Sequence, residues 1–185
     1  MDVLVVAATA GELAWLDDAE ALVVGIGPVE AAVHTAQRLA ASPPDAVLHL
    51  GIAGARADSG LAVGQVVVGT EARYADLAAA LGSLVAVALP DPGLLARTAA
   101  LLPDAPQVPI ATTARVGGGG ADCPVEAMEG FGVLRAAAAA GVPAVEVRAI
   151  SNMVEEADRA RWDIPAGLAA TAAAGRAVLD GLRAG

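Results

Sequence analysis

The sequence predicts a single α/β domain in which helices cover both faces of a central mixed, mostly parallel sheet. Continuous apolar runs rich in valine and leucine, typical of strands buried on both faces, alternate with helix-like segments. Hydrophobic residues make up 56% of the chain but aromatic residues only 2%, which suits close packing of helices on a sheet. The 185 residues suffice for one domain with a real core and are too few for two ordinary ones, so we assign residues 1–185 to one domain.

The first half of the chain begins with a strand expected at residues 2–8, whose turn leads into a short helix at 12–16. A second strand at 21–26 ends at Gly27-Pro28, where a proline suits the first turn of the helix expected at 29–41. Two further strands follow, at 46–50 with a glycine turn over 51–55, and at 64–73.

The second half of the chain repeats the alternation. Strands are expected at 84–89, 108–113 and 144–150, and helices at 92–102, 125–140 and 164–182. Gly141 suits the end of the middle helix. Residues 114–124, with four consecutive glycines, are expected to be a mobile loop, and residues 153–163 a charged, irregular segment.

Charge and composition exclude several classes of protein. A net charge of −10 argues against nucleic acid and anionic membranes as partners. The single cysteine and the spacing of the two histidines offer no disulfide framework and no metal site, and the glycine runs match neither a P-loop nor a dinucleotide fingerprint. We therefore expect no metal and no cofactor. The start of the chain lacks a basic n-region, and no uncharged apolar run reaches ~18 residues, so we expect a cytoplasmic protein.

Polar residues and glycines gather where the expected strands end. Glu12 follows the first strand, Gly54 lies in the turn after the third, Thr113 precedes the glycine loop and Asn152 follows a late strand. Glu129 lies at the start of the helix beyond the loop. Ligands of such sheets bind at the carboxyl ends of the strands, so the sequence predicts one shared pocket.

Each candidate has a plainer explanation that the residues alone leave open. Glu12 could be a general base or merely a favourable charge in the first turn of a helix. Glu129 could accept hydrogen bonds from two sugar hydroxyls or be a helix-start carboxylate of the same kind. Three larger side chains could bind substrate or simply form salt bridges and core packing: Arg73, Arg148 and Trp162.

Four segments together resemble the nucleoside phosphorylase and nucleosidase superfamily, and within it most closely the futalosine hydrolase family. They are AATAGE at 7–12, LGIAGA at 50–55, VEAMEG at 125–130 and RAISNMVEEADRARWDIP at 148–165. The resemblance covers essentially the whole chain, and the last segment is its most specific part. It implies a nucleoside phosphorylase-like three-layer fold, a small nucleoside as the substrate, and a homo-oligomer, either a dimer or a tetramer.

The resemblance also implies roles for individual residues. Glu12 matches the glutamate that activates the attacking water, and Glu129 the residue that accepts the ribose hydroxyls. Met128 matches the residue that packs on the sugar, and Asn152 the residue that contacts the purine near N7. Gly54 matches the point where the backbone approaches the ligand.

Further residues complete the expected binding site. Ile52 lies in the glycine turn and Thr113 precedes the glycine loop, and Val116 is expected to line the base pocket. Arg73 and Arg148 are candidates for the carboxylate end of the substrate. An amide at position 152 can donate to a 6-oxo group and accept from a protonated N7, which suits hypoxanthine and not adenine.

These features predict hydrolysis of futalosine to hypoxanthine and dehypoxanthine futalosine, a step toward menaquinone. The turn ATAGE lacks the arginine that phosphorylases of the superfamily use to hold phosphate, which favours water as the nucleophile. The alternatives are a methylthioadenosine/S-adenosylhomocysteine-type nucleosidase, a purine nucleoside phosphorylase, and a purine-binding module without activity.

Overall fold

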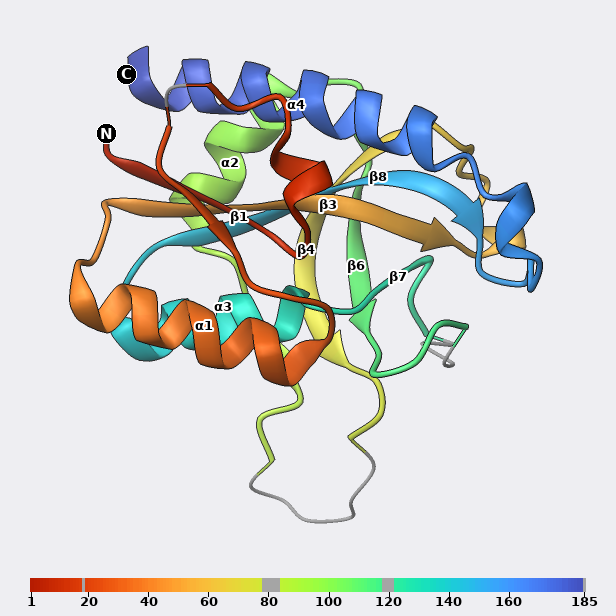
Figure 1. Ribbon diagram of the computed structural model, residues 1–185, viewed down its shortest axis with the longest axis horizontal. Helices are drawn as coiled ribbons and strands as arrows, with labels where there is room; N and C mark the ends of the chain where they lie inside the picture. The colour runs from red at the N-terminus through yellow and green to blue at the C-terminus, as the bar shows by residue number, and fades with distance from the viewer. Residues whose placement is uncertain (18, 78–83, 118–121, 185) are drawn as a thin grey trace.

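The structure is a computed structural model that describes residues 1–17, 19–77, 84–117 and 122–184. A mixed sheet lies between two pairs of helices (Figure 1). Helices α2 (Pro92–Leu101) and α4 (Ile164–Ala184) cover one face, and α1 (Pro28–Ala41) and α3 (Gly130–Ala140) cover the other. The predicted three-layer α/β fold is confirmed.

The sheet follows the strand order β2-β1-β3-β7-β6-β4-β5, and β8 pairs with both β3 and β4. Parallel pairs predominate, while β3 with β7, β4 with β5 and β4 with β8 are antiparallel. The strands are β1 (Val3–Ala7), β2 (Ala21–Val23), β3 (Ala46–Ala55), β4 (Val66–Tyr74), β5 (Val87–Ala88), β6 (Gln107–Thr112), β7 (Val125–Ala127) and β8 (Ala144–Met153). Strands β3, β8, β4, β6 and β7 thus form a closed circuit, which the sequence did not predict.

Small and aliphatic side chains fill the space between the layers, as the composition predicts. Leu48 and Leu50 of β3 pack toward α4. On the opposite face, Val6 packs with Leu134 of α3. Helices α1 and α3 cross so closely that a Cβ added to Gly132 would lie 2.4 Å from the Pro28 carbonyl oxygen. The predicted start of α1 and the predicted end of α3 are confirmed. Pro28 begins α1, and Gly141, in the left-handed conformation, caps α3 at its carboxyl end.

Some predicted elements were wrong. Residues 125–127 form strand β7 instead of helix, and α3 begins only at Gly130, with Glu129 as its N-cap. Residues 51–55 belong to strand β3, which continues past the expected turn with a register shift at Ala53/Gly54. In both cases pairing with distant strands outweighs the local signal.

Three shorter expectations also changed. The first short helix is a 3₁₀ turn (η1, Ala10–Leu13), and strand β5 occupies only two of the residues expected at 84–89. Residues 114–124 were expected to form a mobile loop, and residues 118–121 of this range lie outside the described residues. Within the described parts of the chain, none of the helices has the length and apolar character needed to cross a membrane.

Candidate active site

A cavity of about 330 Å³ opens at the carboxyl ends of β1, β3 and β8. The predicted site residues that line it are Glu12, Ile52, Gly54, Thr113, Val116, Met128, Glu129 and Asn152. Its size is at the lower end of the range for small-molecule sites. The structure therefore brings these residues from five separate segments around one space.

Arg73 is the exception among the predicted site residues. It does not line the cavity, and its guanidinium pairs with Glu71, to which Nε donates over 2.7 Å. Both residues lie on β4, two positions apart, so their side chains leave the same face of the strand. The expectation that Arg73 contacts substrate is therefore not supported by this chain.

Glu12 is positioned by backbone groups from two elements. Its Oε2 accepts hydrogen bonds from the Thr9 amide and hydroxyl, both at 2.9 Å, at the start of η1. Its Oε1 accepts from the Ile52 amide of β3 at 3.0 Å. The side chain is buried, yet it borders the cavity. These donors fix the direction of both oxygens, and Oε1, which accepts only one of them, keeps a lone pair for water or substrate.

Glu129 is held from below in a similar way. One carboxylate oxygen accepts from the Gly27 amide at 3.1 Å and the other from Arg148 Nη2 at 3.3 Å. The side chain is 4% exposed and lines the cavity. The remaining lone pairs can accept two neighbouring hydroxyl groups.

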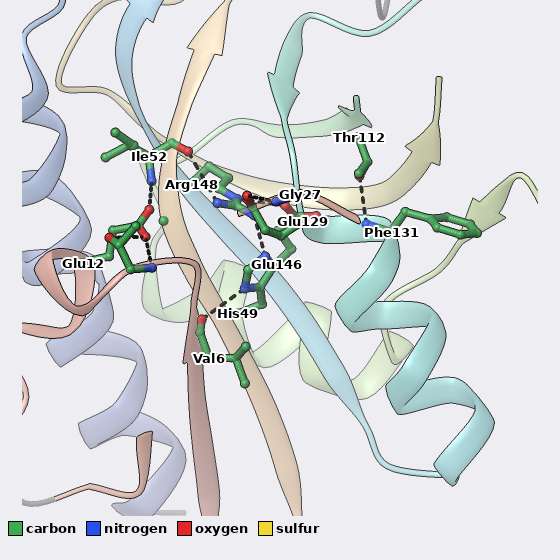
Figure 2. A network of polar contacts seen from close by, with 12 residues as sticks. Val6, Glu12, Gly27, His49, Ile52, Thr112, Glu129, Phe131, Glu146 and Arg148 are labelled. Atoms are coloured by element: carbon green, nitrogen blue, oxygen red, sulfur yellow. Dashed lines mark hydrogen bonds and ion pairs between the residues drawn. The ribbon is translucent and has the colours of Figure 1, made fainter. Parts of the chain in front are cut away.

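Arg148 lies beneath the cavity at the centre of a buried polar network (Figure 2). Its Nε donates to Glu146 at 2.8 Å, and its Nη2 contacts both Glu129 and His49 Nε2. His49 and Glu146 are register partners on β3 and β8, and Gly51 and Arg148 form the pair two positions further along the same face. A Cβ added to Gly51 would lie 2.2 Å from Arg148 Nη1 and 2.6 Å from Glu12 Oε1, so only glycine leaves room for both.

His49 is neutral in this network. The Val6 carbonyl, 3.0 Å away, can only accept, so Nδ1 carries the proton and Nε2 is free to accept from Arg148. Burial lowers the pKa of His49 well below its usual value, and the charge of Arg148 lowers it further. Burial also raises the pKa of Glu146, against the opposing influence of Arg148.

Asn152 lies one residue before the end of strand β8, and its amide has a defined orientation. Its Nδ2 donates to the Met153 carbonyl at 3.0 Å, and its Oδ1 accepts from the Ser151 hydroxyl at 2.8 Å. A Cβ on Gly54 would lie 3.1 Å from this nitrogen, so the glycine makes room for the amide. One hydrogen on Nδ2 and one lone pair on Oδ1 remain for a ligand.

Several residues around the cavity were not singled out from the sequence. Glu126 and Arg159 line it, whereas His49 and Glu146 support it from below. Two buried charges, Glu146 and Arg148, at alternate positions of an apolar strand were the available signal for the network. Arg159 gave no such signal, because its charged segment reads as an ordinary surface loop. Among the described residues, no group of three or more His, Cys, Asp or Glu side chains could hold a metal ion.

Comparison with known proteins relates both the sequence and the fold to one superfamily. The family model of the phosphorylase superfamily matches residues 3–117. The chain is similar to futalosine hydrolase from Streptomyces coelicolor, at 39% identity over 179 residues, covering 83% of this chain and 75% of the relative. It is also 34% identical to futalosine hydrolase from Thermus thermophilus, with 85% and 80% covered.

Solved structures share the fold at lower identity. A mutant futalosine hydrolase of Helicobacter pylori matches with a TM-score of 0.87 at 15% identity, covering 96% of this chain and 98% of that one. S-adenosylhomocysteine nucleosidase from Streptococcus pyogenes, in complex with 5-methylthiotubericidin, matches with a TM-score of 0.86 at 24% identity, covering 98% and 97%. At the sequence level, the family match and the two curated relatives cover most of the chain. The chain therefore belongs to the phosphorylase superfamily and, within it, to the futalosine hydrolase family.

Proposed function

We propose that this enzyme hydrolyses the N-glycosidic bond of futalosine and releases hypoxanthine and dehypoxanthine futalosine. The observation that carries the proposal is that the carboxyl groups of Glu12 and Glu129 and the amide of Asn152 border one cavity. Family membership supplies the substrate class. The reaction would serve menaquinone biosynthesis in the cytoplasm.

Breaking this bond builds positive charge on the ribose and negative charge on the departing purine. Glu129, held by Gly27 and Arg148, accepts the ribose hydroxyls and fixes the sugar. Glu12 orients a water molecule toward the anomeric carbon and takes its proton. The oxygen of that water forms the new bond to the sugar as the glycosidic bond breaks, and the electron pair leaves with the base.

Asn152 is the group proposed to recognise the base. Its free Nδ2 hydrogen can donate to the 6-oxo oxygen, and Oδ1 can accept from N7 once N7 has taken a proton from a second water molecule. The Met153 carbonyl supports this orientation, because turning the amide over would place two oxygens face to face. A 6-amino purine would mismatch both groups, and a buried mismatch of this kind costs several powers of ten in discrimination.

Water is favoured over phosphate as the nucleophile by the charges around Glu12. Glu12, Glu126 and Glu129 all border the cavity and would repel phosphate. Arg148 lies nearby, but it is fully buried and its donors are directed at protein acceptors.

The test compares purified protein on futalosine, its 6-amino analogue, and inosine with and without phosphate. We expect hypoxanthine from futalosine without phosphate, and far slower release of adenine from the 6-amino analogue. Release from inosine only when phosphate is present would identify a phosphorylase, and preference for the 6-amino compound would indicate the methylthioadenosine-type alternative. Binding of hypoxanthine without turnover of any nucleoside would indicate a binding module.

We also infer that the enzyme works as a homo-oligomer, as a dimer or tetramer. Exposed apolar side chains support this: Ile26 is 62% exposed at the cavity, and Val29, at the start of α1, is 65% exposed. Such a cluster is typical of protein interfaces. Light scattering during gel filtration tests the inference, and a monomer at micromolar concentration would contradict it.

A further inference from the structure

The cavity has a strongly uneven distribution of charge. Three carboxylates border it, from Glu12, Glu126 and Glu129. Among the described lining residues, Arg159 is the only cationic side chain. Arg159 comes from the segment between β8 and α4, the blue loop at the right of Figure 1. The three carboxylates come from other parts of the chain.

Arg159 is held in place by an aromatic ring instead of an acid. Its guanidinium lies over the Trp162 ring, 5.1 Å from the centroid, and Trp162 also lines the cavity. The indole is fixed in turn, because its Nε1 donates to the Glu156 carbonyl at 3.0 Å. Stacking leaves the edge of the guanidinium, where its N–H groups are, free to bind an anion.

The neighbouring Arg161 shows what an arginine with structural partners looks like in the same segment. It forms ion pairs with Glu156 at 3.4 Å and with Asp158 at 3.9 Å, and it does not line the cavity. No ion pair of Arg159 is found within the described parts of the chain. The two arginines are two residues apart, but only Arg159 lines the cavity, and only Arg161 is shown paired with carboxylates.

The segment is tied to the catalytic strand. The Asp163 amide donates to the carbonyl of Ser151 at 2.9 Å, directly before Asn152. The Trp162 amide donates to the Arg159 carbonyl at 3.2 Å and closes the turn. Arg159 and Trp162 are therefore carried on backbone anchored beside the base-recognising amide.

We propose that Arg159 and Trp162 form a subsite for an aromatic carboxylate, which in the proposed reaction is the benzoate arm of futalosine. This assignment rests on the proposed function for the identity of the substrate. The guanidinium edge matches a carboxylate with two parallel hydrogen bonds, and the indole with Ile164 and Leu168 offers apolar surface to an aryl ring. The three glutamates repel the same carboxylate, so the substrate enters in one orientation.

The experiment uses Arg159→Met, with Arg161→Met as the matched control. Both remove one guanidinium from the same turn and keep an unbranched apolar chain. The readout is the ratio of kcat/KM for futalosine to kcat/KM for its methyl ester, which lacks the charge. We expect this ratio to fall about tenfold in Arg159→Met, through a higher KM for futalosine, and to stay at the wild-type value in Arg161→Met. Arg159→Lys is expected to recover only part of the loss, since an ammonium cannot make the paired contact.

Calorimetry with futalosine on a Glu12→Gln background separates this subsite from the reaction. Weaker binding in the added Arg159→Met variant supports the subsite even if wild-type enzyme releases no hypoxanthine, an outcome that would overturn the proposed function alone. Equal ratios and equal affinities for the two methionine variants would overturn the subsite while leaving the hydrolase intact. Absence of any futalosine binding would overturn both.

Discussion

Glu12 has little freedom, because three donors from Thr9 and Ile52 hold its two oxygens. Glu12→Gln keeps the shape and one acceptor oxygen but cannot take a proton from water. We expect kcat to fall by about a hundredfold or more, the usual scale of general base catalysis, in a variant that still folds but loses about 1–3 kcal/mol of stability, because its NH₂ faces a backbone N–H. Steady-state kinetics and thermal unfolding check this, with Glu155→Gln, a surface carboxylate paired with Arg56, as the control. Turnover close to wild type would remove Glu12 from the mechanism.

Asn152 is the residue at which substrate choice can be reversed. A protonated aspartic acid at this position can donate its O–H to N7 and accept from a 6-amino group with its other oxygen. Asn152→Asp should therefore lower the ratio of kcat/KM for futalosine to that for its 6-amino analogue by at least about tenfold. Asn152→Ala is the control, since it removes the amide without offering a new acceptor. An unchanged ratio in Asn152→Asp would mean that another group recognises position 6.

Single residues were predictable where their chemistry contradicts their surroundings. Glu12, Glu129 and Asn152 are polar groups at the ends of apolar strands or helices, and the resemblance gave each of them a role that remains a proposal. His49 was considered only for metal binding, because its sequence neighbours do not show that it lies opposite Glu146 on the adjacent strand β8. Arg73 was chosen in place of Arg159 because sequence alone does not reveal which arginine is already paired.

Strand β3 contains a glycine that leaves no room for a side chain. Its Gly51 lies between Arg148 Nη1 and Glu12 Oε1, and an added methyl group would approach them to 2.2 Å and 2.6 Å. Gly51→Ala should lower the free energy of unfolding by about 1–3 kcal/mol, as overpacking does, and should impair catalysis by displacing Glu12. Urea unfolding and kinetics measure both effects.

Gly11→Ala is the matched control for this prediction. It lies on η1 next to Glu12, and its nearest contact would be Thr9 Oγ1 at 3.9 Å. We expect its stability to stay within about 0.5 kcal/mol of wild type. If Gly51→Ala unfolds at the same urea concentration as Gly11→Ala, the side chains of Arg148 and Glu12 can shift to accommodate the methyl group at little cost in stability.

Element boundaries were predictable where local chemistry sets them. Pro28 begins α1 and Gly141 ends α3, as backbone preferences dictate. Strand β7 was missed because its three residues acquire strand geometry only by lying between β3 and β6. Residues 51–55 were taken as a turn because two glycines usually break a strand, whereas here they give Arg148 and Asn152 room.

At the scale of the whole molecule, the buried network links stability to pH. The unfolded chain protonates His49 near its ordinary pKa of about 6.5, while burial and Arg148 hold the native pKa well below that value. The unfolded state thus binds more protons as the pH falls below about 6.5, and native stability declines there by up to about 1.4 kcal/mol per pH unit. Glu146 works in the opposite direction, because its native pKa is raised.

His49→Gln isolates the histidine contribution, since an amide can donate to Val6 and accept from Arg148 without titrating. As the pH falls from 7 to 5.5, we expect the unfolding free energy of wild type to decrease more than that of the variant. Urea unfolding at several pH values measures it. Parallel pH curves for the two proteins would show that His49 does not titrate on unfolding.

The closed strand circuit can form only late in synthesis of the chain. The strand that completes it, β8, is the last strand along the described chain, and it carries both Arg148 and Asn152. Glu12 meets its hydrogen-bond partners Thr9 and Ile52 early, but it borders a cavity shared with Asn152 only after β8 has been synthesised. Nascent chains that stop short of β8 would bury neither the network nor the cavity, so no partly synthesised enzyme should attack nucleosides.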